Sequence, residues 1–232
     1  GCEGSKGGIG MASLGGTLRV GELVPGSVIR HALKINLFGN LNLAYDAGDA
    51  TPGYRWPAIR ADSYAGGNSD CAYGGSVAVL EMGALLALKP EFAVDDLQTE
   101  PARILAQAFQ DYGAYVVDDT CWNVYAIATE WGPDGRVTEE FMETWGFEMQ
   151  TRLLATCTEA SDECRWAQDM ETIFTSLHVV DNNRADNIGG GGLRRVPCAP
   201  PFADGSDGWP QGSVCDAAQF LPNQTYLPFT IS

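Results

Sequence analysis

The sequence has few of the residues, and none of the short motifs, on which common hydrolytic and nucleotide-binding mechanisms depend. Only two histidines occur in 232 residues and no C-x-x-C spacing is present, so a zinc site is the weaker interpretation. The G-x-S-x-G and H-E-x-x-H patterns are absent, which leaves serine-hydrolase and zinc-protease mechanisms without local support. The phosphate-binding pattern G-x-x-x-x-G-K-[ST] is also missing. No motif therefore names a reaction.

Basic residues and long apolar runs are scarce as well. The chain carries 14 Lys and Arg against 30 Asp and Glu, a formal net charge of −16. Nucleic acid and anionic membrane surfaces would repel such a chain, so we expect neither as a partner. No apolar run approaches the ~20 residues of a membrane-spanning helix, so we expect no membrane span. An acidic surface is compatible with neutral glycans, cations or basic partners.

Cysteine is the residue that indicates a compartment. Seven cysteines favour an oxidising environment, and hence an extracellular or cell-surface location. The disulfides that we expect are Cys157–Cys164, Cys198–Cys215 and Cys71–Cys121. This pairing leaves Cys2 without a partner. Because the sequence begins at Gly1 and not at Met, we expect a processed chain whose missing part supplies that partner.

A helix–strand unit is the clearest local structure. Thr99 is placed to cap a helix whose apolar residues recur at helical spacing as far as Tyr112, and Gly113 provides the stop. The apolar run Ala114–Val117 follows and predicts a strand covered on both sides. Asp118 and Asp119 come next, and residues 122–129 are predicted to form the partner strand. The unit therefore delivers two carboxylates to a turn.

The remaining pattern predicts an α+β fold with a largely antiparallel sheet, sandwich or barrel-like, and about three helices. Further strands are expected at 17–23, 28–38 and 77–88, and helices after Thr138 and after Ser161 or Asp162. Regular β–α alternation, the mark of a doubly wound sheet, is missing. We expect residues 1–16 to be a flexible glycine-rich arm and residues 17–232 to be one domain. Its irregular C-terminal segment would begin at about residue 189.

Several stretches of the chain resemble an uncharacterised family of secreted bacterial proteins. The stretches that carry the resemblance are GTLRVGEL, IRHALKI, YRWPA, MGALLAL, DYGAYVVDDT, VVDNN and GGGG. It covers nearly the whole chain and implies an extracellular protein whose relatives extend upstream of Gly1. It implies no activity and no catalytic residues. Cys71 and Cys121 both depart from the family pattern, which fits an extra disulfide between them.

Three residues are candidates for catalysis. Adjacent aspartates on a strand point to opposite faces, so Asp118 and Asp119 could act as an acid/base pair only if the chain bends there. Alternatively one of them pairs with Asp62, Glu130 or Asp181, as in a glycosidase, or both bond turn amides or bind calcium. His31 would be a base oriented by either aspartate, or else a hydrogen-bonded core histidine.

Aromatic residues supply candidates for substrate binding. Tyr54, Trp56, Trp122, Tyr125 and Trp131 could offer ring faces to sugars, with Arg55 and Asp62 bonding the hydroxyl groups, although aromatics at such spacings are more often core residues. The first hypothesis is a secreted hydrolase or lyase acting on polysaccharide or cell-surface glycan without a cofactor, unless calcium takes part. The alternative is a non-enzymatic surface module that either binds carbohydrate or self-assembles as a structural subunit.

Overall fold

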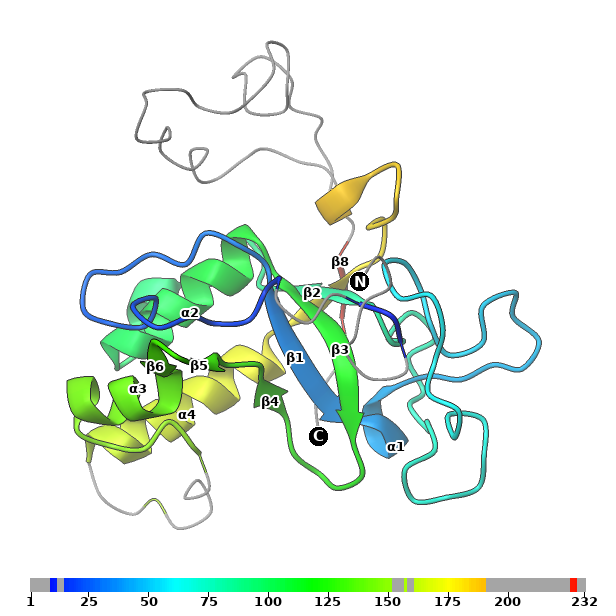
Figure 1. Cartoon of the computed structure of the whole chain (residues 1–232). Coiled ribbons are helices and arrows are strands. Elements are labelled where there is room, and N and C mark those ends of the chain that lie inside the picture. Colours follow the sequence, from blue (N-terminus) through cyan, green and yellow to red (C-terminus); the bar gives the residue numbers. More distant parts are fainter. Residues whose placement is uncertain (1–8, 12–14, 152–156, 158–160, 191–225, 229–232) are drawn as a thin grey trace.

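The computed structural model describes residues 9–11, 15–151, 157, 161–190 and 226–228. Helices and strands are mixed along the chain, and the α+β class predicted from the sequence is confirmed. In Figure 1 the three longer helices lie on one side of strands β1 and β3, and the loops between α1 and β2 lie on the other. No helix in the described part of the chain is both long enough and apolar enough to cross a membrane.

The elements are short, and long connections separate many of them. The strands are β1 Leu33–Phe38, β2 Leu85–Ala87, β3 Ala114–Thr120, β4 Ala126–Ile127, β5 Trp131–Gly132, β6 Gly135–Arg136, β7 His178–Val180 and β8 Tyr226–Pro228. The α-helices are α1 Gly39–Asn42, α2 Glu100–Asp111, α3 Val137–Trp145 and α4 Asp162–Thr175. Two 3-10 turns complete the set, η1 Val94–Asp96 and η3 Ile188–Gly190.

Six strands form one sheet in the order β4-β1-β3-β2-β7-β8, and β5 and β6 form a separate two-stranded ribbon. Every neighbouring pair in the large sheet is antiparallel except β1 and β3, so the predicted antiparallel character is confirmed. The described strands follow a linear order with edges at β4 and β8, which is an open sheet and not the expected sandwich or barrel. The helices cover one side of this sheet, so a second sheet is not needed there.

Helices α2 and α4 pack together through their apolar stripes. The Phe109 ring of α2 meets the edge of Phe174 of α4 at 5.9 Å between centroids. The expected Thr99 cap does not form in the expected way, because its hydroxyl and its amide both donate to the buried carboxylate of Asp169. Two other predicted ends are confirmed: Gly113 takes a positive φ after α2, and Ser161 caps α4 by accepting from Cys164 N. The predicted start at Thr138 is wrong, because α3 begins at Val137 with Arg136 at its N-cap.

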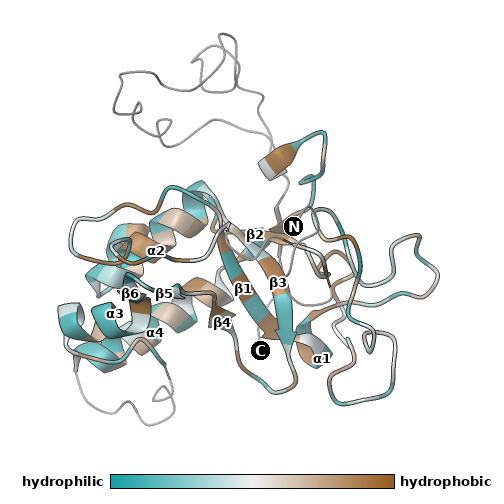
Figure 2. Cartoon of the chain, in the orientation of Figure 1, coloured by the Kyte–Doolittle hydropathy of each residue, from teal (hydrophilic) through white to brown (hydrophobic). Residues whose placement is uncertain are grey.

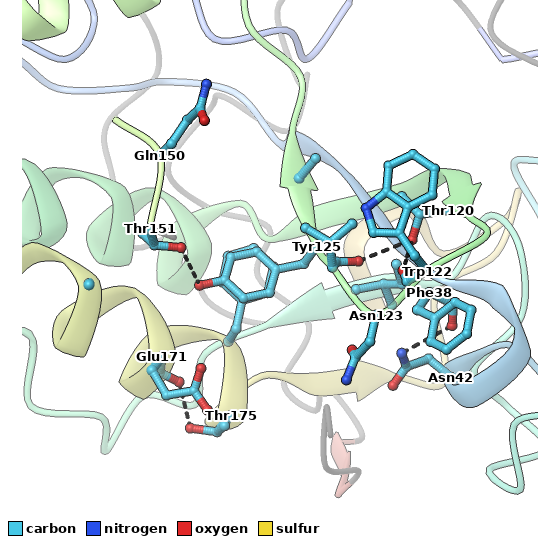
Figure 3. A pocket seen from close by; sticks show the side chains of 15 residues that line it. Phe38, Asn42, Thr120, Trp122, Asn123, Tyr125, Gln150, Thr151, Glu171 and Thr175 are labelled. Carbon is cyan, nitrogen blue, oxygen red and sulfur yellow. Dashed lines mark hydrogen bonds between the residues drawn. The ribbon is translucent and has the colours of Figure 1, made fainter. Parts of the chain in front are cut away.

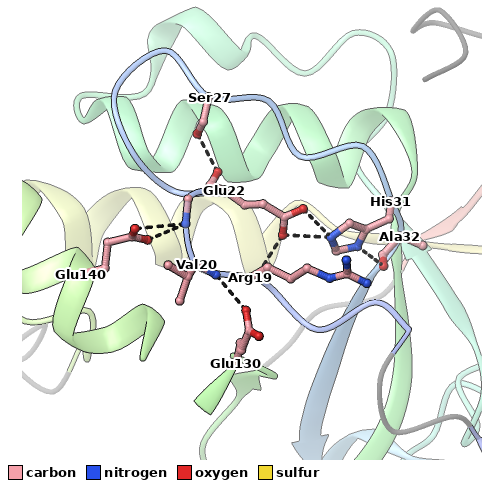
Figure 4. A network of polar contacts seen from close by, with 9 residues as sticks. Arg19, Val20, Glu22, Ser27, His31, Ala32, Glu130 and Glu140 are labelled. Atoms are coloured by element: carbon pink, nitrogen blue, oxygen red, sulfur yellow. Dashed lines mark hydrogen bonds and ion pairs between the residues drawn. The ribbon is translucent and has the colours of Figure 1, made fainter. Parts of the chain in front are cut away.

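Of three strands predicted from the sequence pattern, two are shorter in the structure and one does not form. Only Leu85–Ala87 of the 77–88 run and only Leu33–Phe38 of the 28–38 run are strands. The 17–23 run is not a strand: Leu18 makes a single bridge to Thr129, and beyond it glutamate side chains bind the backbone amides. Val20 N donates to Glu130 and Gly21 N to Glu140 (Figure 4).

Two of the expected disulfides are present. Cys71 joins Cys121, and Cys157 joins Cys164. The first connects the long loop after α1 with the end of β3, across 50 residues of sequence. The predicted Cys198–Cys215 bridge and Cys2 lie outside the described residues. Within the predicted N-terminal arm, Ile9 is fully buried and its carbonyl accepts from Ile59 N.

Candidate functional site

Asp118 and Asp119 lie in the second half of β3, which turns from hydrophobic to hydrophilic where they occur (Figure 2). The register between β1 and β3 shifts here: Ile35 pairs with Val116 but Asn36 pairs with Asp118, so Val117 has no partner in β1. Such a bulge breaks the strict alternation of a strand and re-aims the side chains that follow it. The bend that the sequence analysis required for the two aspartates to act together is therefore present.

The two aspartates join Asp62 in an acidic cluster. One carboxylate oxygen from each of the three lies within 4.8 Å of the others. Two tyrosines on the loop after α1 hold the cluster: the hydroxyl of Tyr64 donates to Asp119 at 2.6 Å, and that of Tyr73 donates to Asp62 at 2.7 Å. Asp62 was one of the three partners considered from the sequence, and the structure brings it to Asp118 and Asp119.

Asp119 has an electrostatically unfavourable position. Its Oδ2 is buried and has no hydrogen-bond partner among the described residues. Gly39 allows this close approach, because a Cβ there would lie 2.6 Å from that oxygen. Burial, and then the negative charges of Asp62 and Asp118, raise the pKa of Asp119, while the hydrogen bond from Tyr64 opposes the rise. Asp119 therefore holds a proton more readily than an ordinary aspartate does.

This arrangement has two chemical capacities. A carboxyl with a raised pKa beside other carboxylates is the arrangement by which enzymes separate a general acid from a base. Three carboxylates this close are also the group of residues in the described chain that could hold a hard divalent cation such as calcium.

The loop that follows β3 is held at both ends. Cys121 is tied to Cys71, and the hydroxyl of Thr120 donates to the carbonyl groups of Trp122 and Val124. These constraints display Trp122 with 67% of its surface exposed. The predicted partner strand at 122–129 is wrong in extent and in neighbour: only Ala126–Ile127 is a strand, and it pairs with β1 rather than β3.

Trp122 stands at the edge of a cavity of about 860 Å³, which we call the polar cavity. Its walls come from β1, the β3–β4 loop, residues 150–151 and one face of α4 (Figure 3). Its polar side chains are Asn42, Thr120, Asn123, Gln150, Thr151, Glu171 and Thr175. Trp122 and Asn42 lie toward one end in Figure 3, Gln150 and Glu171 toward the other, and Tyr125 lies between them. The polar cavity therefore presents aromatic rings together with many hydrogen-bonding groups.

The acidic cluster lies beside the polar cavity and is not part of its lining. Thr120 connects the two, because it follows Asp119 in β3 and lines the cavity. Among the described residues that line the cavity, Glu171 supplies the one carboxylate.

His31 is not at this site. Its Nε2 lies 3.0 Å from Glu22 Oε2, and its Nδ1 lies 3.0 Å from the carbonyl oxygen of Ala32 (Figure 4). It lies two residues before β1, whereas Asp118 pairs with Asn36 inside β1. The expected pairing with an aspartate of β3 is therefore replaced by a pairing with Glu22, and this hydrogen bond raises the pKa of His31.

Three predicted substrate-binding residues also lie elsewhere. Arg55 donates to the carbonyl of Val79 and to the carboxylate and carbonyl of Asp181, so it ties its loop to the end of β7. Tyr54 is half-buried against the core, and Trp56 is half-buried in the same loop. None of the three is among the residues that line the polar cavity. Trp122 and Asp62 are the candidates that the structure places at or beside it.

The sequence analysis did not single out Tyr64, Tyr73 or the amide residues of the cavity. Tyr64 and Tyr73 flank Cys71, so the predicted disulfide could have pointed to them as neighbours of Asp119. Asn123 shares a loop with Trp122, so it could have been found as a neighbour of that residue. Tyr125 was one of the aromatic residues expected from the sequence to bind sugar, and it lines the cavity. Gln150 and Glu171 come from distant elements, and no local signal identifies them.

The resemblance to a family of secreted bacterial proteins stays a prediction. In comparisons with known proteins, the chain matches no family model, no curated protein and no solved structure.

Proposed function

We propose that the protein is a secreted carbohydrate-binding protein that takes a glycan in the polar cavity. The observation that carries this proposal is the cavity itself: about 860 Å³, with the exposed ring of Trp122 at one end and amide, hydroxyl and carboxylate side chains along its walls. Sugar rings have apolar faces and polar rims. Aromatic side chains bind the first by contact, and a few placed polar groups bind the second.

The rigidity of the Trp122 loop supports the proposal. The disulfide and the two hydrogen bonds of Thr120 hold the ring in place before any ligand arrives. A site that is ordered in advance loses less conformational entropy on binding. The two disulfides also support the extracellular location, since such bonds persist in oxidising compartments.

The lining favours binding over hydrolysis. Glycosidases place two carboxyl groups on either side of the bond that they cleave. Within the described lining the polar cavity has Glu171 alone, and the acidic cluster lies outside it. A non-enzymatic module therefore accounts for the cavity better than the hydrolase or lyase that was the first hypothesis.

Trp122→Ala tests the proposal on a glycan array and in solution titrations of the polysaccharides that bind. We expect a loss of about 30-fold in affinity, because truncating an aromatic residue that packs on the ligand costs about 2 kcal/mol. Trp131→Ala is the matched control, since Trp131 is 77% exposed and lies outside the lining of the cavity. Equal loss in both variants, or no glycan bound by the wild type, contradicts the proposal.

A glycan hydrolase remains a second candidate because of one observation, the raised pKa of Asp119 within the acidic cluster. In that mechanism Asp119 is the acid and Asp62 its carboxylate partner. Release of reducing sugar from a bound polysaccharide, abolished by Asp119→Asn and kept by Trp131→Ala, would establish it. Glycan binding without any release of reducing sugar would support the non-enzymatic module instead.

A further inference from the structure

A second, smaller hollow adjoins the polar cavity. We call it the apolar pocket; its volume is about 190 Å³. It shares four lining residues with the polar cavity: Tyr125, Ala126, Gln150 and Thr151. Its other lining residues are Ile127, Thr129, Thr138, Met149, Trp166 and Met170. The two spaces therefore lie on either side of a common wall.

The two spaces differ in the side chains that line only one of them. Four of the six residues special to the apolar pocket are Ile, Met or Trp, and the indole N–H of Trp166 already donates to the carbonyl of Met149 at 3.0 Å. These side chains favour an apolar group by contact, and the hydroxyl and amide groups of Thr129, Thr138, Gln150 and Thr151 stand beside them. Five of the eleven residues special to the polar cavity carry an amide, hydroxyl or carboxylate group. A ligand that joins a polar body to a small apolar substituent suits both spaces.

The common wall is fixed. The ring of Tyr125 stacks on Phe174 at 3.7 Å between centroids, with an interplanar angle of 19°. Its hydroxyl lies 3.5 Å from Thr151 Oγ1 (Figure 3). Both contacts hold the ring against α4 and residue 151, so the apolar pocket is a standing feature and does not depend on a movement of Tyr125.

We infer that the apolar pocket binds the short acyl group of an N-acylated amino sugar whose ring lies in the polar cavity. The inference rests on the proposed carbohydrate binding and names the substrate class. A cavity of about 150 Å³ lined by aliphatic and aromatic side chains holds benzene, so about 190 Å³ has room for an acyl chain of two to four carbons. The amide of the substituent would pass beside Gln150 and Thr151, which line both spaces.

The test compares three methyl glycosides by ligand-observed NMR titration: those of glucose, N-acetylglucosamine and N-butanoylglucosamine. We expect affinity to increase in this order. From the N-acetyl to the N-butanoyl sugar, each of the two added methylenes should raise affinity about fourfold, which corresponds to about 0.8 kcal/mol. In Thr138→Phe the new ring should fill the pocket and abolish the preference for the acyl sugars while the glucoside still binds. Thr138 is an exposed residue of α3, so the protein should fold.

Thr144→Phe is the control, because Thr144 is exposed on the same helix and lines neither space. Thr138→Glu carries the same expectation if the Phe variant does not fold. Equal affinity for all three glycosides overturns this inference alone. An acyl preference that survives in both Thr138 variants overturns the placement in the apolar pocket. If no glycoside and no glycan binds, the proposed function fails together with it.

Discussion

Replacing Asp119 by Asn should make the protein more stable at neutral pH, although it neutralises a half-buried carboxylate that accepts a short hydrogen bond. The wild-type carboxylate has Asp62 and Asp118 as neighbours, with oxygen atoms within 4.8 Å of one another. Its Oδ2 is buried, and no donor in the described part of the chain bonds it. Asparagine keeps an oxygen for the hydroxyl of Tyr64 and removes the charge.

The magnitude follows from these distances. Two unit charges 4.8 Å apart repel by about 0.9 kcal/mol in water and by about 3.5 kcal/mol at an effective dielectric constant of about 20. Two such repulsions near the lower figure total about 2 kcal/mol. The hydrogen bond from Tyr64 loses about 1 kcal/mol when its acceptor becomes neutral. We therefore expect a net stabilisation of about 1 kcal/mol, or about 2–4 °C in Tm for a chain of this size.

The dependence on pH gives the sharper test. The pKa of Asp119 is raised by folding, so the folded protein binds the proton more tightly than the unfolded chain does. Between the unfolded value of about 3.9 and the raised value, the wild type loses stability as the pH rises. Below that window the carboxyl is protonated in both states. The stability difference between Asp119→Asn and the wild type should therefore be small in acid and grow as the pH passes the folded pKa.

Urea unfolding in EDTA, at a series of pH values from 4 to 8, measures this difference without competition from bound cations. Asp134→Asn removes the same charge from an exposed turn between β5 and β6 and should show no such trend. A variant that is less stable than the wild type at pH 7.5, or a difference that does not change with pH, would refute the electrostatic argument.

Two further predictions concern stability. Replacing both Cys71 and Cys121 by Ser should lower the free energy of unfolding by about 4 kcal/mol, the loop-closure entropy of a bridge that spans 50 residues. A urea midpoint below that of the oxidised wild type, with the difference lost when both proteins are reduced, would confirm it. Asp169→Ala should cost about 3 kcal/mol, because it leaves the amides of Gln98 and Thr99 and the hydroxyl of Thr99 without their acceptor. The neighbouring exposed Gln168→Ala should change the urea midpoint little, and a similar loss in both variants would contradict the assignment.

Sequence patterns predicted the structure best where the deciding interactions are local. The helix from Glu100 to its glycine stop and the Ser161 cap of α4 depend on residues a few positions apart, and both are present. The strands at 17–23 and 77–88 were overpredicted, because an apolar run does not reveal where its amides find acceptors. At Val20 the acceptor is a glutamate 110 residues away.

In the candidate site, too, features that depend on neighbouring residues were predicted and those that depend on distant residues were not. The two adjacent aspartates and Trp122 were visible because they follow a buried strand and a predicted disulfide. The bulge at Val117 was not, since it appears only when β3 is aligned with a parallel neighbour that lies far away in the sequence. His31 was misplaced for a related reason: alternation put it in a strand that begins two residues later, and its partner Glu22 belongs to an irregular segment.

The 17–27 segment has a consequence for the order in which the molecule folds. Glu100, Glu130 and Glu140 bind its amides from positions 74, 110 and 119 residues further along the chain. Contacts of such long range cost loop-closure entropy, so we expect them to form after α2, α3 and the connection between β4 and β5 have assembled. We expect the segment to settle after the folding transition state, so weakening it would speed unfolding and leave the folding rate almost unchanged. The N-terminal part of the described chain would thus govern the lifetime of the native state rather than the speed of reaching it.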